Sequence, residues 1–165
     1  GYQKIKRNFD LVIDIQGDEP LIDPGHIDQI IDFHINNNDA DIVLPSLKIS
    51  KQENDNIIKI VKDVDNKVLY LSRSKVPYDF RIKKNYLYKH LSIISFKPKA
   101  LIKFSKSKIT HLEKIEGIEL LRAIELGLTI KSPNLKGNSF AVEVKSDYNK
   151  AKIFIKRDRF YKFYK

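Results

Sequence analysis

Two acidic residues near the start of the sequence stand where a ligand or a metal ion could bind. Asp18 and Glu19 lie in residues 16–20, Gln-Gly-Asp-Glu-Pro, which follow the mostly apolar run of residues 10–15. Ligands bind beyond the carboxyl ends of strands in open α/β sheets, and carboxylate oxygens suit a hard cation such as Mg²⁺. The alternative is an ordinary turn in which the two acids cap the following helix.

Two further groups combine charge and hydrogen-bonding capacity at predicted strands. Residues 72–75 are Ser-Arg-Ser-Lys, and such a group can bind a carboxylate or a phosphate, with Arg73 suited to bidentate pairing. The alternative is a hairpin end in solvent. His90 lies within a second strand-like run, where a single histidine is more often structural than catalytic.

Three glutamates share one side of a predicted helix. Glu116 lies three residues from both Glu113 and Glu119, so the three carboxylates are neighbours on the helix surface. Clustered negative charge needs a cation, a polyol or solvent, and solvent is the default interpretation. The sequence contains no Gly-x-Ser-x-Gly, Walker A, Gly-x-Gly-x-x-Gly or His-Glu-x-x-His motif.

The elements that must position these groups begin with a strand, a helix and a strand. Residues 10–15 predict a buried strand, and Asp23 followed by Pro24 predicts the start of a helix. Residues 27, 30, 31 and 34 give that helix one apolar stripe, and residues 40–46 predict the next strand. This order indicates a parallel α/β sheet.

The middle of the chain is richer in strands. Residues 57–62 and 68–72 predict a hairpin around the polar turn of residues 63–67. Residues 86–97 form a second β-prone run, and residues 100–105 predict a short helix. The sequence therefore predicts one α/β domain, residues 1–165, with an inserted antiparallel section.

The last third of the sequence begins with a capping box. Thr110 and Glu113 predict the start of a helix that ends at Gly127 and buries five apolar residues: Leu112, Ile115, Ile118, Leu121 and Ile124. Residues 128–132 and 141–144 predict strands. Ser146 is the expected N-cap of a last helix with an aromatic end at residues 160–164.

Composition narrows the class of protein. The 165 residues, 42% hydrophobic, contain no cysteine, which excludes disulfide scaffolds, thiolate zinc sites and cysteine nucleophiles. No apolar run reaches the length of about 18 residues that a membrane span needs, so we expect a soluble intracellular protein. The net charge of +10 fits nucleic acid, an anionic membrane, a phosphorylated substrate or a lysine-rich codon bias, and only residues 152–165 combine clustered cations with aromatics.

Taken together and in order, these clusters resemble the 3-deoxy-manno-octulosonate cytidylyltransferase (CMP-Kdo synthetase) family. The similar segments are residues 16–22 (Q-G-D-E-P in the family), 54–61 (N-x-N-x-V-K-V-V), 69–77 (A-L-Y-F-S-R-S-x-I-P), 89–93 (K-H-L-G-I) and 112–122 (L-E-x-x-E-x-L-E-Q-L-R). The resemblance implies a Rossmann-like nucleotide-diphospho-sugar transferase fold with a mixed sheet. It also implies transfer of CMP from CTP to an eight-carbon acid sugar, with release of pyrophosphate, for lipopolysaccharide biosynthesis.

The resemblance also assigns roles to residues. Asp18 would bind Mg²⁺ and, with Arg73, serve catalysis, while Gln16, Arg73 and His90 would hold the acid sugar. Glu113 and Glu116 would lie by the sugar hydroxyls. The second metal ligand would be Glu143, where the family has Asp.

Departures from the family pattern leave alternatives open. Glu143 replaces Asp, Leu120 replaces Gln, and Ser92 and Ile94 replace Gly and Tyr. A catalytically degenerate homologue acting as a binding or scaffold protein is therefore the alternative to the enzyme. An RNA-binding module is a third hypothesis, which rests on charge alone.

Three further expectations follow from the resemblance. The family's G-x-x-R-x-x-x-K and S-G-T-D-R segments have no counterpart and the sequence has no Met, so we expect the N-terminal nucleotide-binding part to be missing and the chain alone to be inactive. We expect a homodimer formed through residues 86–97. The expected setting is the cytoplasm, with CTP and the acid sugar as partners and neither nucleic acid nor membrane.

Overall fold

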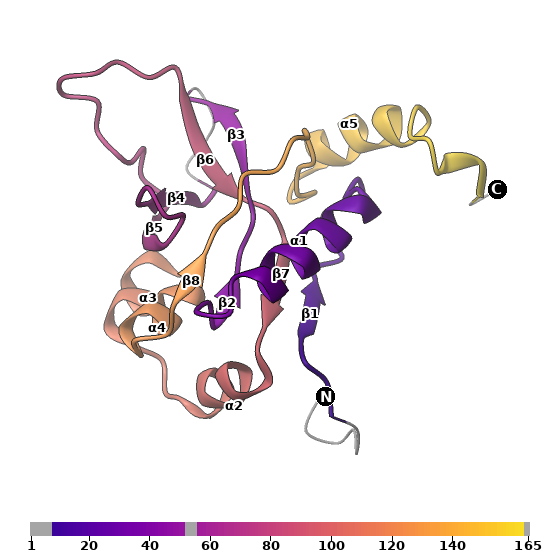
Figure 1. The fold of residues 1–165 in the computed structure, drawn as a ribbon. Helices are drawn as coiled ribbons and strands as arrows, with labels where there is room; N and C mark the ends of the chain where they lie inside the picture. Colours follow the sequence, from indigo (N-terminus) through magenta and orange to yellow (C-terminus); the bar gives the residue numbers. More distant parts are fainter. Residues whose placement is uncertain (1–7, 52–55, 164–165) are drawn as a thin grey trace.

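A computed structural model describes residues 8–51 and 56–163, which form helices and two four-stranded sheets (Figure 1). The strands are β1 (Val12–Ile15), β2 (Ile42–Val43), β3 (Ser46–Ser50), β4 (Lys59–Lys62), β5 (Val68–Ser72), β6 (Tyr86–His90), β7 (Ile93–Phe96) and β8 (Ile130–Lys131). The helices are α1 (Pro24–Asn36), α2 (Pro98–Lys106), α3 (His111–Glu116), α4 (Leu120–Glu125) and α5 (Lys145–Ile155), followed by a 3₁₀ turn at Tyr161–Phe163. The predicted α/β class is confirmed.

The first sheet is mixed, with the strand order β1-β7-β2-β8. Both β1 and β2 pair antiparallel with β7, and β2 pairs parallel with β8. The expectation of a parallel sheet from the opening strand–helix–strand was therefore wrong, because β7 is inserted between the two opening strands. The mixed sheet that the resemblance implied is confirmed.

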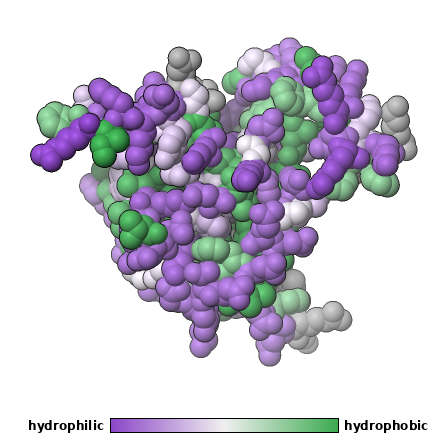
Figure 2. Space-filling view, turned by 45° about the horizontal axis from the view of Figure 1, so that its top comes forward, coloured by the Kyte–Doolittle hydropathy of each residue, from purple (hydrophilic) through white to green (hydrophobic). Residues whose placement is uncertain are grey.

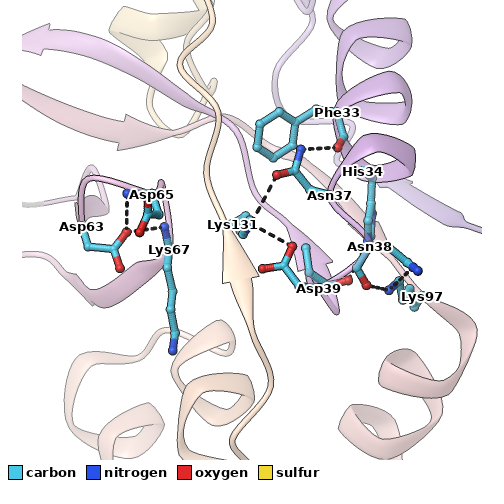
Figure 3. A network of polar contacts seen from close by, with 11 residues as sticks. Phe33, His34, Asn37, Asn38, Asp39, Asp63, Asp65, Lys67, Lys97 and Lys131 are labelled. Carbon is cyan, nitrogen blue, oxygen red and sulfur yellow. Dashed lines mark hydrogen bonds and ion pairs between the residues drawn. The ribbon is translucent and has the colours of Figure 1, made fainter.

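The second sheet is the inserted antiparallel section, with the strand order β3-β6-β4-β5. The predicted hairpin is its β4–β5 pair. Asp63 stabilises the turn, because its Oδ1 accepts hydrogen bonds from the backbone N–H groups of Asp65 (3.0 Å) and Lys67 (2.8 Å) (Figure 3). Asn66 adopts the left-handed conformation, with φ of 64°, which Asn tolerates better than most residues.

The β-prone run of residues 86–97 forms two strands rather than one. Strand β6 belongs to the second sheet and β7 to the first. The chain passes between the sheets at Leu91, whose N–H donates to the carbonyl of Pro45 at 3.0 Å. Pro45 lies where the chain makes the same passage from β2 to β3, so the two crossings meet and hold the sheets together.

Helix α1 begins as predicted. Asp23 is the N-cap, its Oδ1 accepting a hydrogen bond from the N–H of Gly25 at 2.9 Å, and Pro24 opens the helix. At the other end, Lys131 Nζ donates to Asn37 Oδ1 at 3.3 Å and pairs with Asp39 Oδ1 at 2.8 Å (Figure 3). His34 Nδ1 lies 2.7 Å from the hydroxyl of Ser95 in β7. These contacts fix α1 on the first sheet.

The single helix expected from residue 110 to Gly127 is two helices. Gly117 adopts a left-handed conformation (φ 64°) after α3, and α4 begins at Leu120. As a result Ile115 is 65% exposed instead of buried, whereas Ile118 and Leu121 are buried. The predicted start is confirmed: Glu113 Oε2 accepts a hydrogen bond from the N–H of Thr110 at 3.3 Å. The predicted short helix of residues 100–105 is confirmed as part of α2.

The C-terminal expectations were partly wrong. Residues 141–144 form no strand, and the N-cap of α5 is Val144 rather than Ser146. Asp147 Oδ2 accepts the N–H groups of Glu143 (3.3 Å) and Val144 (3.2 Å), which gives the helix start its partner. The aromatic end contains the 3₁₀ turn, and residue 164 lies outside the described residues.

Two apolar clusters lie on opposite sides of the first sheet. One, with Ile30, Val43 and Ile93, packs under α1, and the other joins Phe96, Leu121 and the inner side chains of β4 and β5. Helix α5 projects at the end of the molecule opposite α2 (Figure 1). The surface drawn in Figure 2 is mostly hydrophilic. Among residues 8–51 and 56–163, no helix has the length and apolar character of a membrane span.

Candidate functional site

A cleft of about 650 Å³ opens on the face of the first sheet opposite α1. Its apolar wall includes Ile94 and Phe96 of β7 and Leu101 of α2. Its polar wall contains five residues to which the resemblance assigned roles: Gln16, Asp18, Arg73, His90 and Glu143. Glu19 and Glu119, also singled out from the sequence, line it too. These residues come from separate parts of the chain, so the fold brings together groups that only their order along the sequence had connected.

Gln16 and Asp18 reach the cleft from the end of β1. The pairing of β1 with β7 ends at Ile15 and Ile93, and the N–H of Gln16 then donates to the carbonyl of Ser92 at 3.0 Å. This bond holds the start of residues 16–20, the acidic loop, against β7. The side chains of Gln16 and Asp18 remain exposed to solvent and can meet a ligand.

Glu143 reaches the same cleft from the segment before α5. The N–H of Val142 donates to the carbonyl of Asp18 at 2.8 Å, so the residue before Glu143 is bonded to the backbone of Asp18. Both carboxylates are exposed and line one cleft. In the described part of the chain, no group of three or more acidic or histidine side chains is arranged to hold a metal ion. Two carboxylates nevertheless fit Mg²⁺, which usually binds one or two together with substrate phosphates and water.

Arg73 is held at the end of β5 by backbone carbonyls. Its Nη1 donates to Asn56 O at 2.9 Å, its Nε to Glu116 O at 3.0 Å and its Nη2 to Gly117 O at 3.4 Å. Lys59, which is fully buried, donates from Nζ to the carbonyl of Arg73 at 2.6 Å. Since a guanidinium has five N–H groups, these three bonds leave at most two for a ligand in the cleft.

Glu116 and Glu113 have protein partners instead of a place on the cleft wall. Glu116 accepts hydrogen bonds from the Ser72 hydroxyl (2.7 Å) and the Arg73 N–H (3.0 Å). Burial acts to raise the pKa of Glu116, but these hydrogen bonds outweigh it and the pKa lies below its usual value. Glu113 is 7% exposed and pairs with Arg122 at 2.8 Å. Of the three glutamates, only Glu119 lines the cleft, so the geometry gives no support to sugar contacts from Glu113 or Glu116.

His90 is neutral at physiological pH. Burial in the cleft wall, together with the positive charge of the neighbouring Lys89, lowers the pKa of His90 to about 4, although Asp18 acts in the opposite direction. Its Nδ1 is buried and has no hydrogen-bond partner within the described residues. A neutral imidazole carries one donor and one acceptor, which suits a hydroxyl group more than a charge.

Comparison with known proteins shows to which protein family the chain belongs. A sequence model described as cytidylyltransferase matches residues 3–130. The chain belongs to the cytidylyltransferase family. It is similar to the 3-deoxy-manno-octulosonate cytidylyltransferases of Thermodesulfovibrio yellowstonii, with 38% identity over 146 residues, and of Rickettsia prowazekii, with 36% over 152 residues. These matches cover 83% and 91% of this chain but only 57% and 60% of the relatives.

A solved structure shows the same fold. It is that of CMP:2-keto-3-deoxy-manno-octonic acid synthetase complexed with CTP, with a TM-score of 0.85 and 24% identity. The similarity covers 94% of this chain and 64% of the solved one. The fold implied by the sequence motifs is therefore confirmed, and the chain spans less than two thirds of the length of these relatives.

Some site residues of this cytidylyltransferase-family chain were missed from the sequence. Lys59 supports Arg73, and a charged residue inside the apolar run of residues 57–62 was the available signal. Asn56 accepts from Arg73, although residues 54–55 of the same motif lie outside the described residues. Asp14 also lines the cleft, two residues before Gln16 and therefore on the same face of the strand. Leu120 lines it too, but is 8% exposed and packs in the core.

Proposed function

We propose that the protein transfers a cytidylyl group from CTP to 3-deoxy-D-manno-octulosonate or a closely related acid sugar, with release of pyrophosphate. The observation that carries the proposal is that Gln16, Asp18, Arg73, His90 and Glu143 line one cleft in a chain of the cytidylyltransferase family. The printed names of the relatives support the choice of nucleotide and sugar. The product would serve lipopolysaccharide assembly in the bacterial cytoplasm.

The reaction needs positioning and charge neutralisation more than covalent chemistry from the protein. A sugar hydroxyl attacks the α-phosphorus of CTP, an O–P bond forms, and the bond to pyrophosphate breaks. Asp18 and Glu143 would hold Mg²⁺, which would neutralise negative charge on the phosphates. The two carboxylates suit this role because both are exposed on the same cleft wall.

The other cleft residues would orient the acid sugar. Arg73 is fixed by three backbone carbonyls, so its remaining N–H groups are preorganised for a carboxylate. His90, held neutral, can exchange one hydrogen bond with a sugar hydroxyl. The amide of Gln16 can donate and accept in the same way.

The decisive measurement is pyrophosphate release from CTP and 3-deoxy-D-manno-octulosonate with Mg²⁺, made on the protein as its native gene encodes it. We expect release clearly above the background without sugar. Activity with a different acid sugar, but not with 3-deoxy-D-manno-octulosonate, would agree with cytidylyl transfer and would exclude 3-deoxy-D-manno-octulosonate as the substrate. Calorimetry with CTP and Mg²⁺ tests the scaffold alternative, since a pure scaffold should give no saturable heat.

Asp18→Asn should reduce turnover to less than about a tenth, because it removes an anionic metal ligand while keeping the size of the side chain. The matched control is Asp65→Asn, which alters an exposed aspartate in the β4–β5 turn, away from the cleft. Circular dichroism should show both variants folded. Retention of more than about a tenth of the rate by Asp18→Asn alone would contradict the metal role.

We further propose a homodimer that uses residues 86–97. The backbone edges of β6 and β7 are already paired within the chain, so the contact would use side-chain faces. Light scattering at micromolar concentration should give twice the monomer mass, and a monomer would count against the proposal.

A further inference from the structure

Three buried polar side chains have no role in the proposed reaction, although two of them, Glu19 and Lys89, line the cleft. Glu19, Lys89 and Ser139 are 5%, 7% and 5% exposed. They come from the acidic loop, from strand β6 and from the irregular segment between β8 and α5. Burying charged groups is costly unless they are paired and hydrogen-bonded, so a cluster of this kind needs an explanation.

Each member of the cluster contacts the other two. The Ser139 hydroxyl donates to Glu19 Oε2 at 3.0 Å, and Lys89 Nζ lies 3.6 Å from Glu19 Oε1. Lys89 Nζ also donates to the backbone carbonyl of Ser139 at 2.5 Å. The cluster therefore joins three segments of chain through both side-chain and backbone atoms.

The cluster joins the two segments of chain that carry the candidate metal ligands. Glu19 follows Asp18 in the sequence, and Ser139 precedes Glu143 by four residues. Lys89 is anchored in the second sheet, where it pairs with Leu47 of β3 and Lys59 of β4. Its position therefore restrains both of the segments that carry the carboxylates.

Further contacts extend the restraint along the segment that leads to Glu143. The N–H of Leu135 donates to Ser46 O at 2.9 Å, and His26 Nε2 lies 2.9 Å from Lys136 O. A side chain at Gly137 would lie 3.2 Å from the His26 ring, so the backbone packs closely against α1 there. Beyond Ser139, the bond from Val142 N–H to Asp18 O completes the attachment.

We propose that Glu19, Lys89 and Ser139 are positioning residues that set the separation of the Asp18 and Glu143 carboxylates, and thereby the affinity of this pair for a divalent cation. The inference rests on the metal site of the proposed function. It follows from the strict geometry of Mg²⁺, which tolerates displaced ligands poorly. Groups that orient metal ligands commonly change affinity by tenfold or more when they are removed.

The test compares Mn²⁺ binding, followed by electron paramagnetic resonance, with stability. In the double variant Glu19→Leu/Lys89→Met both charges are removed, so no unpaired buried charge remains and stability should change little. We expect its Mn²⁺ affinity to fall about tenfold. We also expect faster hydrogen exchange at the Val142 amide, measured without metal.

Ser139→Ala gives a second, milder measurement that keeps the charged pair. We expect it to weaken Mn²⁺ binding at least threefold, whereas the control Ser105→Ala, on the exposed side of α2, should leave binding unchanged. If the double variant does not fold, this single variant decides the question. A Ser139→Ala protein with unchanged Mn²⁺ affinity and unchanged Val142 exchange would overturn the proposal.

The proposal and the proposed function fail in different ways. Mn²⁺ binding that is lost in Asp18→Asn but equal in the unaltered protein and the double variant would overturn the positioning role alone. Absence of Mn²⁺ binding in the unaltered protein would overturn both the metal site and the positioning role.

Discussion

At the scale of single residues, the environment of His90 opposes its protonation. Its pKa is lowered to about 4, first by burial and then by Lys89, whereas an unfolded histidine has a pKa near 6.5. Between these values the unfolded chain binds more protons than the folded one, so acidification favours unfolding. Above about pH 6.5 both states are neutral at this residue and the penalty disappears.

We therefore expect the free energy of unfolding to fall as the pH is lowered from about 6.5 to 4. The full difference would contribute about 3 kcal/mol, an upper value for a side chain that keeps some solvent contact. Urea unfolding at several pH values should show a smaller loss for His90→Gln than for the unaltered protein. An identical pH dependence in the two proteins would contradict the role of His90, since other groups titrate equally in both.

Single residues also show which parts of the candidate site could be predicted from the sequence and which could not. The ordered motifs identified Gln16, Asp18, Arg73, His90 and Glu143, which all line the cleft. The resemblance placed Glu113 and Glu116 by the sugar hydroxyls, but neither motif nor helix spacing shows which protein groups surround a side chain. Both residues are bonded to other side chains of the protein. The burial of Glu19 could not be predicted from the sequence either, because Glu19 is bonded to Ser139, which lies 120 residues away along the chain.

At the scale of elements, the break between α3 and α4 depends on one backbone conformation. Gly117 has φ of 64°, and a Cβ added there would meet nothing within 4 Å. The cost of a side chain is therefore that of the left-handed conformation itself, about 1–2 kcal/mol. Gly117→Ala should lower the unfolding free energy by this amount in chemical denaturation.

Gly17→Ala is the matched control for this change. Its added Cβ also meets nothing within 4 Å, and Gly17 has no positive φ. We expect its stability to be unchanged or slightly raised, because alanine restricts the unfolded chain. Equal losses in the two variants would show that the left-handed conformation is not what Gly117 supplies.

Elements with strong local signals were predicted well, and those defined by distant partners were not. The Asp23–Pro24 helix start and the β4–β5 hairpin are encoded within a few residues. No glycine or proline marks the passage at Leu91 between β6 and β7, because it follows from which sheet each half joins. Residues 141–144 have strand-like composition, yet Val142 bonds the acidic loop instead of a neighbouring strand.

At the scale of the whole molecule, the apolar cluster under α1 and the candidate cleft lie on opposite faces of the first sheet. Ile30 of α1 is fully buried in the cluster under that helix, while the cleft lies on the other face. Ile30→Ala should cost about 3 kcal/mol, as expected for a large side chain removed from a core. Thermal unfolding should shift down by about 6–12 °C for a chain of this size.

The same variant should bind CTP and Mg²⁺ with unchanged affinity at a temperature where it remains folded. Calorimetry on the unaltered protein and Ile30→Ala, side by side, measures this separation. A large loss of binding in the folded variant would show that the two faces of the sheet are coupled.

The attachment of residues 139–142 to the acidic loop has a consequence for protein synthesis. Glu19 and Ser139 are 120 residues apart in the sequence, so their contact closes a very long loop. Contacts of this range form late in folding, because the chain must lose much freedom before they form. On the ribosome, Asp18 emerges before Glu143 and stays without it until the segment between them has been translated. A nascent chain would therefore complete its binding cleft only after the strands of both sheets have been translated.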